Sequence, residues 1–183
     1  MQDAVKLIAN HKGAEEIWSC SHAPVYTTGY RAVDNRLVAR LPAPTVVCDR
    51  GGETTFHGPG QLMLYPLLNL KERQIGVRDY VHALEQSCIV FLQELWGIDA
   101  FRHCGLPGVW STQGKLVAIG LKVTHGVVYH GMALNIDVNL DYFAAINPCG
   151  SGLSADRVVD HAAVAQDYCS LAEVWKRCLL AEL

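Results

Sequence analysis

The segment GVWSTQGKLVAIGLKVTHGVVYHGMALNIDV, residues 108–138, constrains the fold more than any other part of the chain. It contains three runs rich in β-forming residues, separated by turn signals at Thr112 to Gly114 and at Thr124 to Gly126. Short runs joined by tight turns are typical of neighbouring antiparallel strands. The sequence therefore predicts an antiparallel meander here.

The second hairpin of this meander contains glycines within its strands. If its turn centres on His125, then Gly120 lies opposite His130 and beside Gly131. Strand glycines often mark the close approach of a ligand, so an elongated apolar group could lie in the gap that they leave. A bulge or a tight contact between a helix and the sheet is the alternative explanation.

The rest of the chain supplies both helices and strands. With no regular alternation of strands and helices and no linker, residues 1–183 predict one α+β domain. The predicted elements are an amphipathic helix over residues 2–12, strands over 17–20, 45–48 and 62–70, a turn over 24–29, a core-facing helix over 77–96 that stops at Gly97, and a last helix whose capping box runs from Ser170 to Glu173.

Composition excludes several classes of function. A net charge of −3 and a pI near 6.2 lack the basic excess that nucleic-acid and anionic-membrane binding require. No secretory signal pattern and no apolar run of about 20 residues is present, so we expect a cytoplasmic protein that neither spans nor binds a membrane. The seven scattered cysteines, without a CxxC pair, favour neither a disulfide framework nor a structural zinc site.

The stretch RGGETTFHGPGQ, residues 50–61, is rich in glycine, and phosphate, a metal, a hydrocarbon chain or no ligand at all are its possible occupants. It lacks the GxxxxGK[ST] pattern, and no helix is predicted to follow it, so nucleotide phosphate is disfavoured. His57 and His130 lack the spacing of metal ligands, which favours hydrogen-bonded structural histidines and no metal.

Two residues are candidates for the chemistry, a cysteine as a nucleophile and a lysine as the cation that would favour its thiolate. In INPCG, residues 146–150, Pro148 and Gly150 place Cys149 on a tight turn, although a loop cysteine without a function is the alternative. Lys115 begins a strand whose other residues on the same face are apolar. Burying an ammonium group on such a face costs free energy, which suggests that the lysine has a function there. A solvated lysine at the end of a strand is the simpler explanation.

Taken together, RGGETTFHGPGQ, GVW, GKLVAIGLKV, HGMALNI and INPCG resemble the lipoyl(octanoyl) transferase family, the lipoate-protein ligase B type of the biotin/lipoate protein ligase superfamily. The resemblance spans roughly residues 15 to 153. It implies a mixed or antiparallel central sheet, a smaller sheet and flanking helices. Compared with the family pattern the chain begins late and is expected to lack a first strand.

The resemblance also implies a reaction and a set of site residues. Cys149 carries the octanoyl group as a thioester, and Lys115 lowers the pKa of that thiol and handles protons. The implied acyl-binding residues are Arg50, Gly51, Gly52, Glu53, Thr54, Thr55, Phe56, His57, Ala118, Ile119, Gly120, Gly131, Met132 and Ala133.

The implied partners are an acyl carrier protein as donor and, as acceptors, the lipoyl domains of 2-oxoacid dehydrogenase subunits and the glycine-cleavage carrier protein. A monomer that uses neither ATP nor a metal is expected. The alternatives are an ATP-dependent lipoate or biotin ligase, which needs no thiol such as that of Cys149, and a non-catalytic acyl-binding protein.

Overall fold

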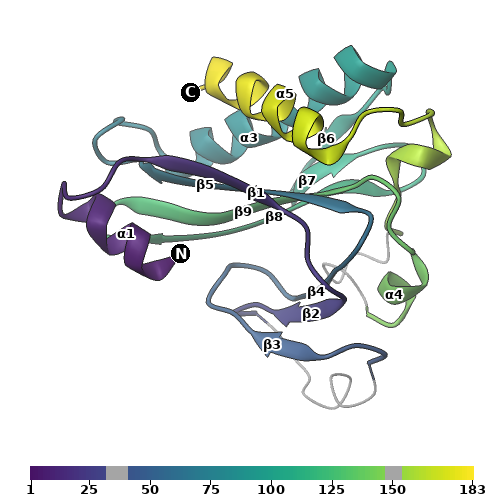
Figure 1. Ribbon diagram of the computed structural model, residues 1–183, viewed down its shortest axis with the longest axis horizontal. Helices are drawn as coiled ribbons and strands as arrows, with labels where there is room; N and C mark the ends of the chain where they lie inside the picture. Colours follow the sequence, from purple (N-terminus) through teal and green to yellow (C-terminus); the bar gives the residue numbers. More distant parts are fainter. Residues whose placement is uncertain (32–40, 147–153) are drawn as a thin grey trace.

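The computed structural model describes residues 1–31, 41–146 and 154–183. Within these residues, a six-stranded antiparallel sheet lies over a three-stranded mixed sheet (Figure 1). The predicted α+β class is confirmed. In spatial order the large sheet contains β1 (Glu16–Cys20), β5 (Gln61–Asn69), β9 (Val127–Asn135), β8 (Lys115–Thr124), β7 (Leu106–Trp110) and β6 (Phe101–His103), and the small sheet contains β3 (Thr45–Val47), β2 (Val25–Thr28) and β4 (Thr54–His57).

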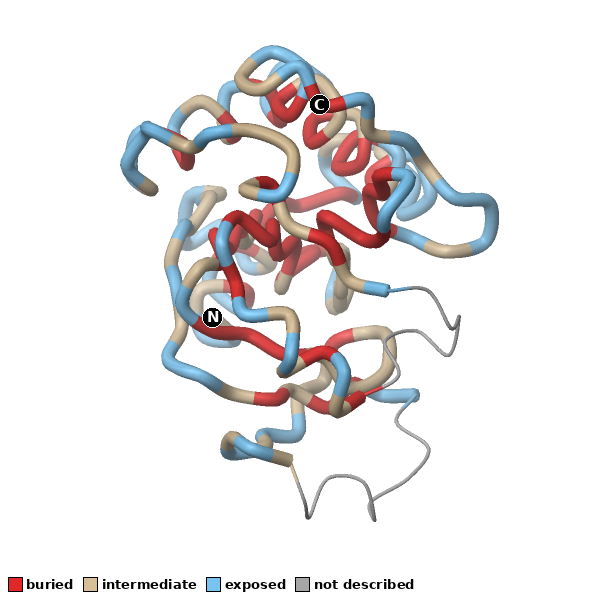
Figure 2. Tube along the Cα trace, turned by 90° about the vertical axis from the view of Figure 1, so that its right-hand side faces the viewer, coloured by how far each residue is buried: buried red, intermediate tan, exposed pale blue. Residues whose placement is uncertain are grey.

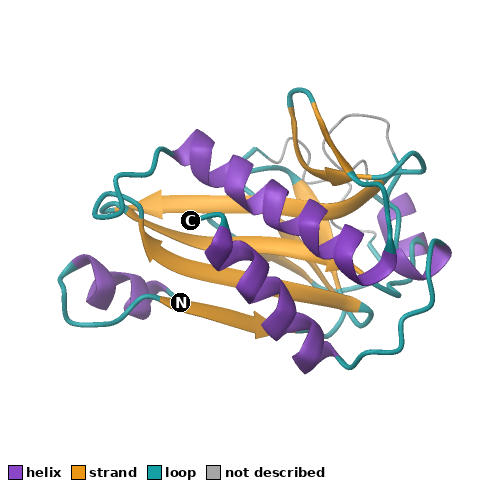
Figure 3. Ribbon diagram, turned by 90° about the horizontal axis from the view of Figure 1, so that it is seen from above, coloured by secondary structure: helices purple, strands orange, loops and turns teal. Residues whose placement is uncertain are grey.

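Two long helices cover one face of the large sheet, and the short helix α1 lies on the other (Figures 1 and 3). None of the helices in the described ranges is long and apolar enough to cross a bilayer. The helices are α1 (Gln2–Ala9), α3 (Val77–Trp96), α4 (Asp141–Ala144) and α5 (Tyr168–Ala181), with a 3₁₀ turn at Val158–Asp160.

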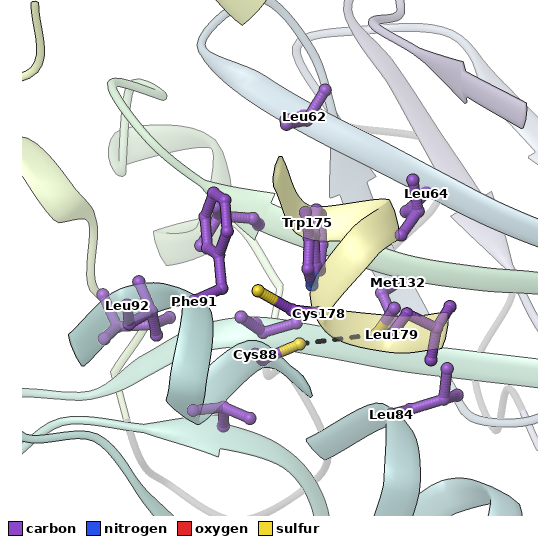
Figure 4. Packing of buried hydrophobic residues seen from close by; sticks show 14 of the residues in the cluster. Leu62, Leu64, Leu84, Cys88, Phe91, Leu92, Met132, Trp175, Cys178 and Leu179 are labelled. Atoms are coloured by element: carbon purple, nitrogen blue, oxygen red, sulfur yellow. Dashed lines mark hydrogen bonds between the residues drawn. The ribbon is translucent and has the colours of Figure 1, made fainter. Parts of the chain in front are cut away.

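The main core lies between α3, α5 and the large sheet (Figure 4). Trp175 of α5 is fully buried and stacks on Phe91 of α3, with ring centroids 5.6 Å apart. Cys88 contacts Met132 of β9 across the same interface, with 3.4 Å between their sulfur atoms. Burial raises the pKa of the Cys88 thiol to about 12, so this cysteine is an apolar core residue.

On the opposite side of the sheet there are two smaller apolar clusters, one under α1 and one that includes Tyr26 and Phe56 of the small sheet. Val5 and Ile8 of α1 pack on Leu67 and Tyr129, which confirms the inward face predicted for this helix. Buried residues, drawn in red, alternate with partly buried ones along the trace (Figure 2).

The helix ends follow two different rules. Gly97 ends α3 with φ at +65°, a left-handed conformation that glycine adopts without strain, and this end was predicted. The start of α5 was not predicted correctly. Asp167 caps it, because its Oδ1 accepts from the backbone N–H groups of Cys169 and Ser170 at 2.9 and 3.0 Å. The predicted capping box at Ser170 is therefore wrong by one turn.

Three further expectations needed correction. The predicted turn over residues 24–29 contains β2, the central strand of the small sheet, and residues 54–57 of the glycine-rich stretch form β4 beside it. The meander is confirmed, but its second turn has two residues, His125 and Gly126, since Thr124 pairs with Val127. This shifts the hairpin register by one residue.

Candidate active site

A cavity of about 530 Å³ lies between the large sheet and the small sheet, and it is the size of a small-molecule site. Its described lining includes residues from all three predicted acyl-binding segments. Phe56 is not among them, because it points from the other side of β4 and stacks on Tyr142, with ring centroids 4.2 Å apart. The predicted residues that line the cavity are Arg50, Gly51, Gly52, Glu53, Thr54, Thr55, His57, Lys115, Ala118, Ile119, Gly120, Gly131, Met132 and Ala133.

Lys115 lies at the first position of β8 and its side chain is 7 % exposed. Its Nζ donates to the carbonyl of Pro107 at 3.2 Å and lies 4.4 Å from the centroid of the Trp110 ring. A cation above an indole face is stabilised by the ring quadrupole. The simpler expectation of a solvated lysine is wrong, because the ammonium group is held at the cavity wall.

Gly108 lies beside Lys115 in the neighbouring strand β7. Its φ is +126°, and a Cβ built there would come within 2.5 Å of the carbonyl oxygen of Val117 but only into ordinary contact with Lys115 Cε, at 3.4 Å. Its backbone N–H donates to Glu85 Oε1 at 3.0 Å, which ties β7 to α3. Gly108 and Trp110 are the first and last residues of the motif GVW, to which the sequence alone assigned no role. The cradle of Lys115, which consists of Pro107, Gly108 and Trp110, was missed.

Arg50 and Gly51 together connect the two sheets. Its guanidinium donates to Thr27 Oγ1 from Nε at 3.1 Å and from Nη2 at 2.9 Å, while Gly51 N–H donates to the carbonyl of Leu121 at 2.8 Å. A Cβ on Gly120 would approach Arg50 Cδ to 3.0 Å. The predicted space at Gly120 therefore receives the Arg50 side chain.

Gly131 pairs with Gly120, where the sequence placed His130 opposite Gly120. A Cβ on Gly131 would collide with the carbonyl oxygen of Leu64 and come within 2.9 Å of Pro66 Cδ in β5. The two glycines are thus adjacent, as proposed, but each allows protein atoms to approach closely. Both glycines line the cavity, but the cavity is not a space left between them.

Two histidines at the cavity wall differ in environment. His130, with φ at +60°, is 2.8 Å from Asp49 Oδ1 through its Nε2, which confirms a hydrogen-bonded histidine. His57 Nδ1 is buried and has no hydrogen-bond partner among the described residues. Burial, followed by the charges of Arg50 and His22, lowers the pKa of His57 to about 3. His57 is therefore neutral at physiological pH and cannot serve there as a cationic group.

Buried amides connect the glycine-rich segment to the start of β8. Gln61 Oε1 accepts from Gly58 N–H at 3.2 Å, and Gln61 Nε2 donates to Asn135 Oδ1 at 2.7 Å. Asn135 in turn donates to the carbonyl of Lys115 at 3.3 Å. These residues were absent from the predicted site, although both lie in the motifs HGPGQ and HGMALNI. Among the described residues no three His, Cys, Asp or Glu side chains are grouped as metal ligands.

Cys149, the predicted nucleophile, lies outside the described residues, and so do Pro148 and Gly150. Its role stays a prediction.

The sequence matches the family "Lipoyl protein ligase A/B catalytic domain" over residues 2–181. The chain belongs to this family. An octanoyltransferase of Bordetella parapertussis (strain 12822) is 45 % identical over 170 residues, which cover 88 % of this chain and 76 % of that protein. The resemblance seen in the sequence is thereby confirmed.

Solved structures of the superfamily share the fold. A lipoate-protein ligase A bound with ATP has a TM-score of 0.69 at 13 % identity, covering 98 % of this chain and 78 % of that one. A biotin protein ligase from Aquifex aeolicus in complex with biotin and ATP has a TM-score of 0.58 at 15 % identity, covering 86 % and 69 %. At these identities the likeness concerns the architecture alone, and it confirms the predicted biotin/lipoate protein ligase-like fold.

Proposed function

We propose that the chain transfers an octanoyl group to lysines of lipoyl-dependent proteins, with Lys115 and Cys149 as its chemical pair. Octanoyl transfer follows from family membership together with the 45 % identity to an octanoyltransferase. The assignment of Lys115 is supported by one observation above all. Its ammonium group is buried beside a cavity whose walls are the segments predicted to bind the acyl chain.

The proposed reaction has two steps. The thiolate of Cys149 attacks the thioester carbonyl of the donor, the carbon–sulfur bond to the donor breaks, and the donor leaves as a thiol. The acceptor lysine amine then attacks the new thioester, the amide forms, and the Cys149 thiolate leaves. Lys115 carries the proton between the thiol, the leaving group and the attacking amine.

Energetics support a reaction without ATP or a metal. Exchange of one thioester for another is nearly balanced, and conversion of a thioester to an amide is downhill, so neither step needs an activated intermediate such as an acyl-adenylate. As the donor we propose the phosphopantetheine thioester of acyl carrier protein. The proposed acceptors are lipoyl domains of 2-oxoacid dehydrogenase subunits and the glycine-cleavage carrier protein.

The function is tested by incubating the protein with octanoyl-acyl carrier protein in the absence of ATP and measuring intact mass. We expect an octanoyl adduct on the wild type that is lost in Cys149→Ala and kept in Cys104→Ala, which removes an exposed cysteine elsewhere. Addition of a lipoyl domain should then move the octanoyl group to that domain. Lipoylation that requires ATP, with no adduct, would establish the ligase alternative; binding without an adduct or transfer would establish a non-catalytic protein.

Lys115→Ala should slow octanoyl transfer by about 10²–10⁴-fold, the usual contribution of a positioned proton-transfer group. Lys122→Ala in the same strand is the matched control and should retain the wild-type rate. The readout is the single-turnover rate from octanoyl-enzyme to lipoyl domain. A Lys115→Ala protein as fast as the control would remove Lys115 from the mechanism.

A further inference from the structure

The chain segment Ser154–Asp156 lies against the start of β8 and holds both backbone groups of Lys115. Lys115 N–H donates to the carbonyl of Ser154 at 2.9 Å, and Asp156 N–H donates to the carbonyl of Lys115 at 3.0 Å. Ala155 forms the matching parallel bridge. Lys115 already pairs with Trp110 of β7, and this segment adds hydrogen-bond partners for both its backbone N–H and its carbonyl.

The side chain of Asp156 is almost completely buried, with 2 % of the residue exposed. Its Oδ2 accepts from the hydroxyl of Ser111 and lies 2.6 Å from His161 Nε2, and its Oδ1 accepts from Arg157 N–H at 2.8 Å. A buried carboxylate is stable only when its oxygens are hydrogen-bonded in this way.

This group of residues is not a second nucleophilic centre. In a serine–histidine–aspartate triad the histidine lies between the other two side chains and accepts the serine proton. Here the aspartate is in the middle, and both Ser111 and His161 contact the same oxygen. The hydroxyl of Ser111 is oriented toward the carboxylate and is unavailable as a nucleophile.

Ser111 also organises the turn that leads into Lys115. Because its hydroxyl donates to Asp156, its oxygen is free to accept from the backbone N–H groups of Gln113 and Gly114 at 3.0 and 3.2 Å. Asp156 therefore acts on Lys115 from two directions, through the turn before it and through the segment beside it. The carbonyl of Asp156 adds a third connection by accepting from Asn135 at 2.9 Å.

We propose that Asp156 is a positioning residue that fixes the Lys115 ammonium group at the wall of the acyl cavity. The proposal rests on the proposed function, in which Lys115 carries the proton. A lysine side chain has several rotatable bonds, and holding its ammonium group in one place requires a fixed backbone as well as contacts along the stem. Gly108 and Trp110 supply the contacts, and Asp156 supplies the fixed backbone.

The first test is a double-mutant cycle on the transfer step. Asp156→Asn keeps the shape but replaces one acceptor oxygen with an NH₂ group, and we expect a loss of about tenfold in the single-turnover rate. In a Lys115→Ala background the same change should have less than about a twofold effect, because the residue through which it acts is gone. An equal loss in both backgrounds would show that Asp156 does not act through Lys115. The matched control is Asp160→Asn, a partly exposed carboxylate paired with Arg157, which should leave the rate unchanged.

The second test reads the position of Lys115 without any reaction. In protein labelled with ¹³C at the lysine ε-carbons, the Lys115 signal is identified by its disappearance in Lys115→Arg. The Trp110 ring current should set it apart from exposed lysines such as Lys12, since Nζ lies 4.4 Å from that ring. In Asp156→Asn we expect it to move toward the position of the exposed lysines, and in Asp160→Asn to stay.

The two tests separate the proposal from the function on which it rests. If Lys115→Ala transfers at the wild-type rate, the mechanism fails, and the position of the Lys115 signal alone decides whether Asp156 fixes the ammonium group. If Asp156→Asn does not fold, Ser111→Ala and His161→Gln each remove one partner of the carboxylate and should move the signal in the same direction. An unmoved Lys115 signal in every folded variant would overturn the proposal.

Discussion

The two faces of the large sheet meet their covering layers through different interactions. On one face, α3 and α5 contribute apolar side chains such as Phe91 and Trp175, which stack on each other and pack against the sheet. On the other face, the backbone N–H of Gly51 donates to the carbonyl of Leu121 in the large sheet, while Arg50 donates to Thr27 of the small sheet. The cavity lies between the two sheets. Apolar packing gains free energy by removing voids, whereas directional polar contacts can hold two layers apart. The helical face therefore supplies stability, and the cavity face supplies the site.

The largest effect is expected on the helical face. Trp175→Ala removes a fully buried ring and should lower the free energy of unfolding by about 3–5 kcal/mol. Leu180→Ala, which removes an exposed leucine from the same helix, should have almost no effect. Urea unfolding measures both. The octanoyl-transfer rate per folded molecule should stay at the wild-type value in Trp175→Ala, and a changed rate would contradict the separation of the two faces.

A polar contact on the cavity face comes next. Thr27→Val keeps the volume but removes the oxygen that accepts twice from Arg50, and should cost about 1.5–3 kcal/mol because the donor is charged and buried. Unlike Trp175→Ala, it should also raise the KM for the acyl donor, since Arg50 and Thr27 both line the cavity. The control is Thr45→Val in the edge strand β3. Loss of stability with an unchanged KM would mean that the polar contacts serve stability alone.

The stability of the cavity face should also depend on pH, because the buried His57 lines the cavity. In the unfolded chain His57 titrates near 6.5, while in the folded protein its pKa is about 3. As the pH falls below 6.5, the unfolded state binds a proton that the folded state does not, so the free energy of unfolding decreases by up to about 1.4 kcal/mol per pH unit. His57→Gln should remove this decrease between pH 7.5 and 5.5, and the exposed His82→Gln should not. The prediction fails if the free energy of unfolding, measured with urea, changes equally with pH in His57→Gln and in the wild type.

The smallest effect is expected at the start of α5. Asp167→Ala removes the cap and should lower the melting temperature slightly, whereas Ser170→Ala should lower it less because Asp167 still accepts from the backbone. The transfer rate should be the same in both. A larger decrease in melting temperature in Ser170→Ala than in Asp167→Ala would support the cap at Ser170 that the sequence predicted.

Sequence periodicity predicted the long elements of the fold because each has many residues of one pattern. The helix Val77–Trp96 and the meander are examples, and both are confirmed. Short strands gave no such signal. β2 has four residues, and its prediction as a turn followed from the flanking Pro24 and Gly29, while its pairing with β3 and β4 depends on contacts far away in the chain. Local pattern cannot report those contacts.

The candidate site divides in the same way. The structure brings Lys115 and residues of the three predicted segments to one cavity, and the sequence could single them out because they lie in recognisable motifs. Phe56 shows the limit, since alternation along β4 turns it away, and β4 was not predicted. Asp156 had no local signal at all. Its proposed role rests on contacts with Ser111 and His161, which only the folded chain brings together.

The two-residue turn at His125 and Gly126 has a consequence for the order of assembly. It brings Gly120 next to Gly131, so two of the three segments predicted to bind the acyl chain belong to one hairpin. Closing so short a loop costs little chain entropy, and hairpins form in about 1–10 μs. The third segment, by contrast, reaches the hairpin across more than sixty residues of chain, the sequence distance between Gly51 and Leu121. We therefore expect one wall of the cavity to form early in folding and to act as the template on which the small sheet docks.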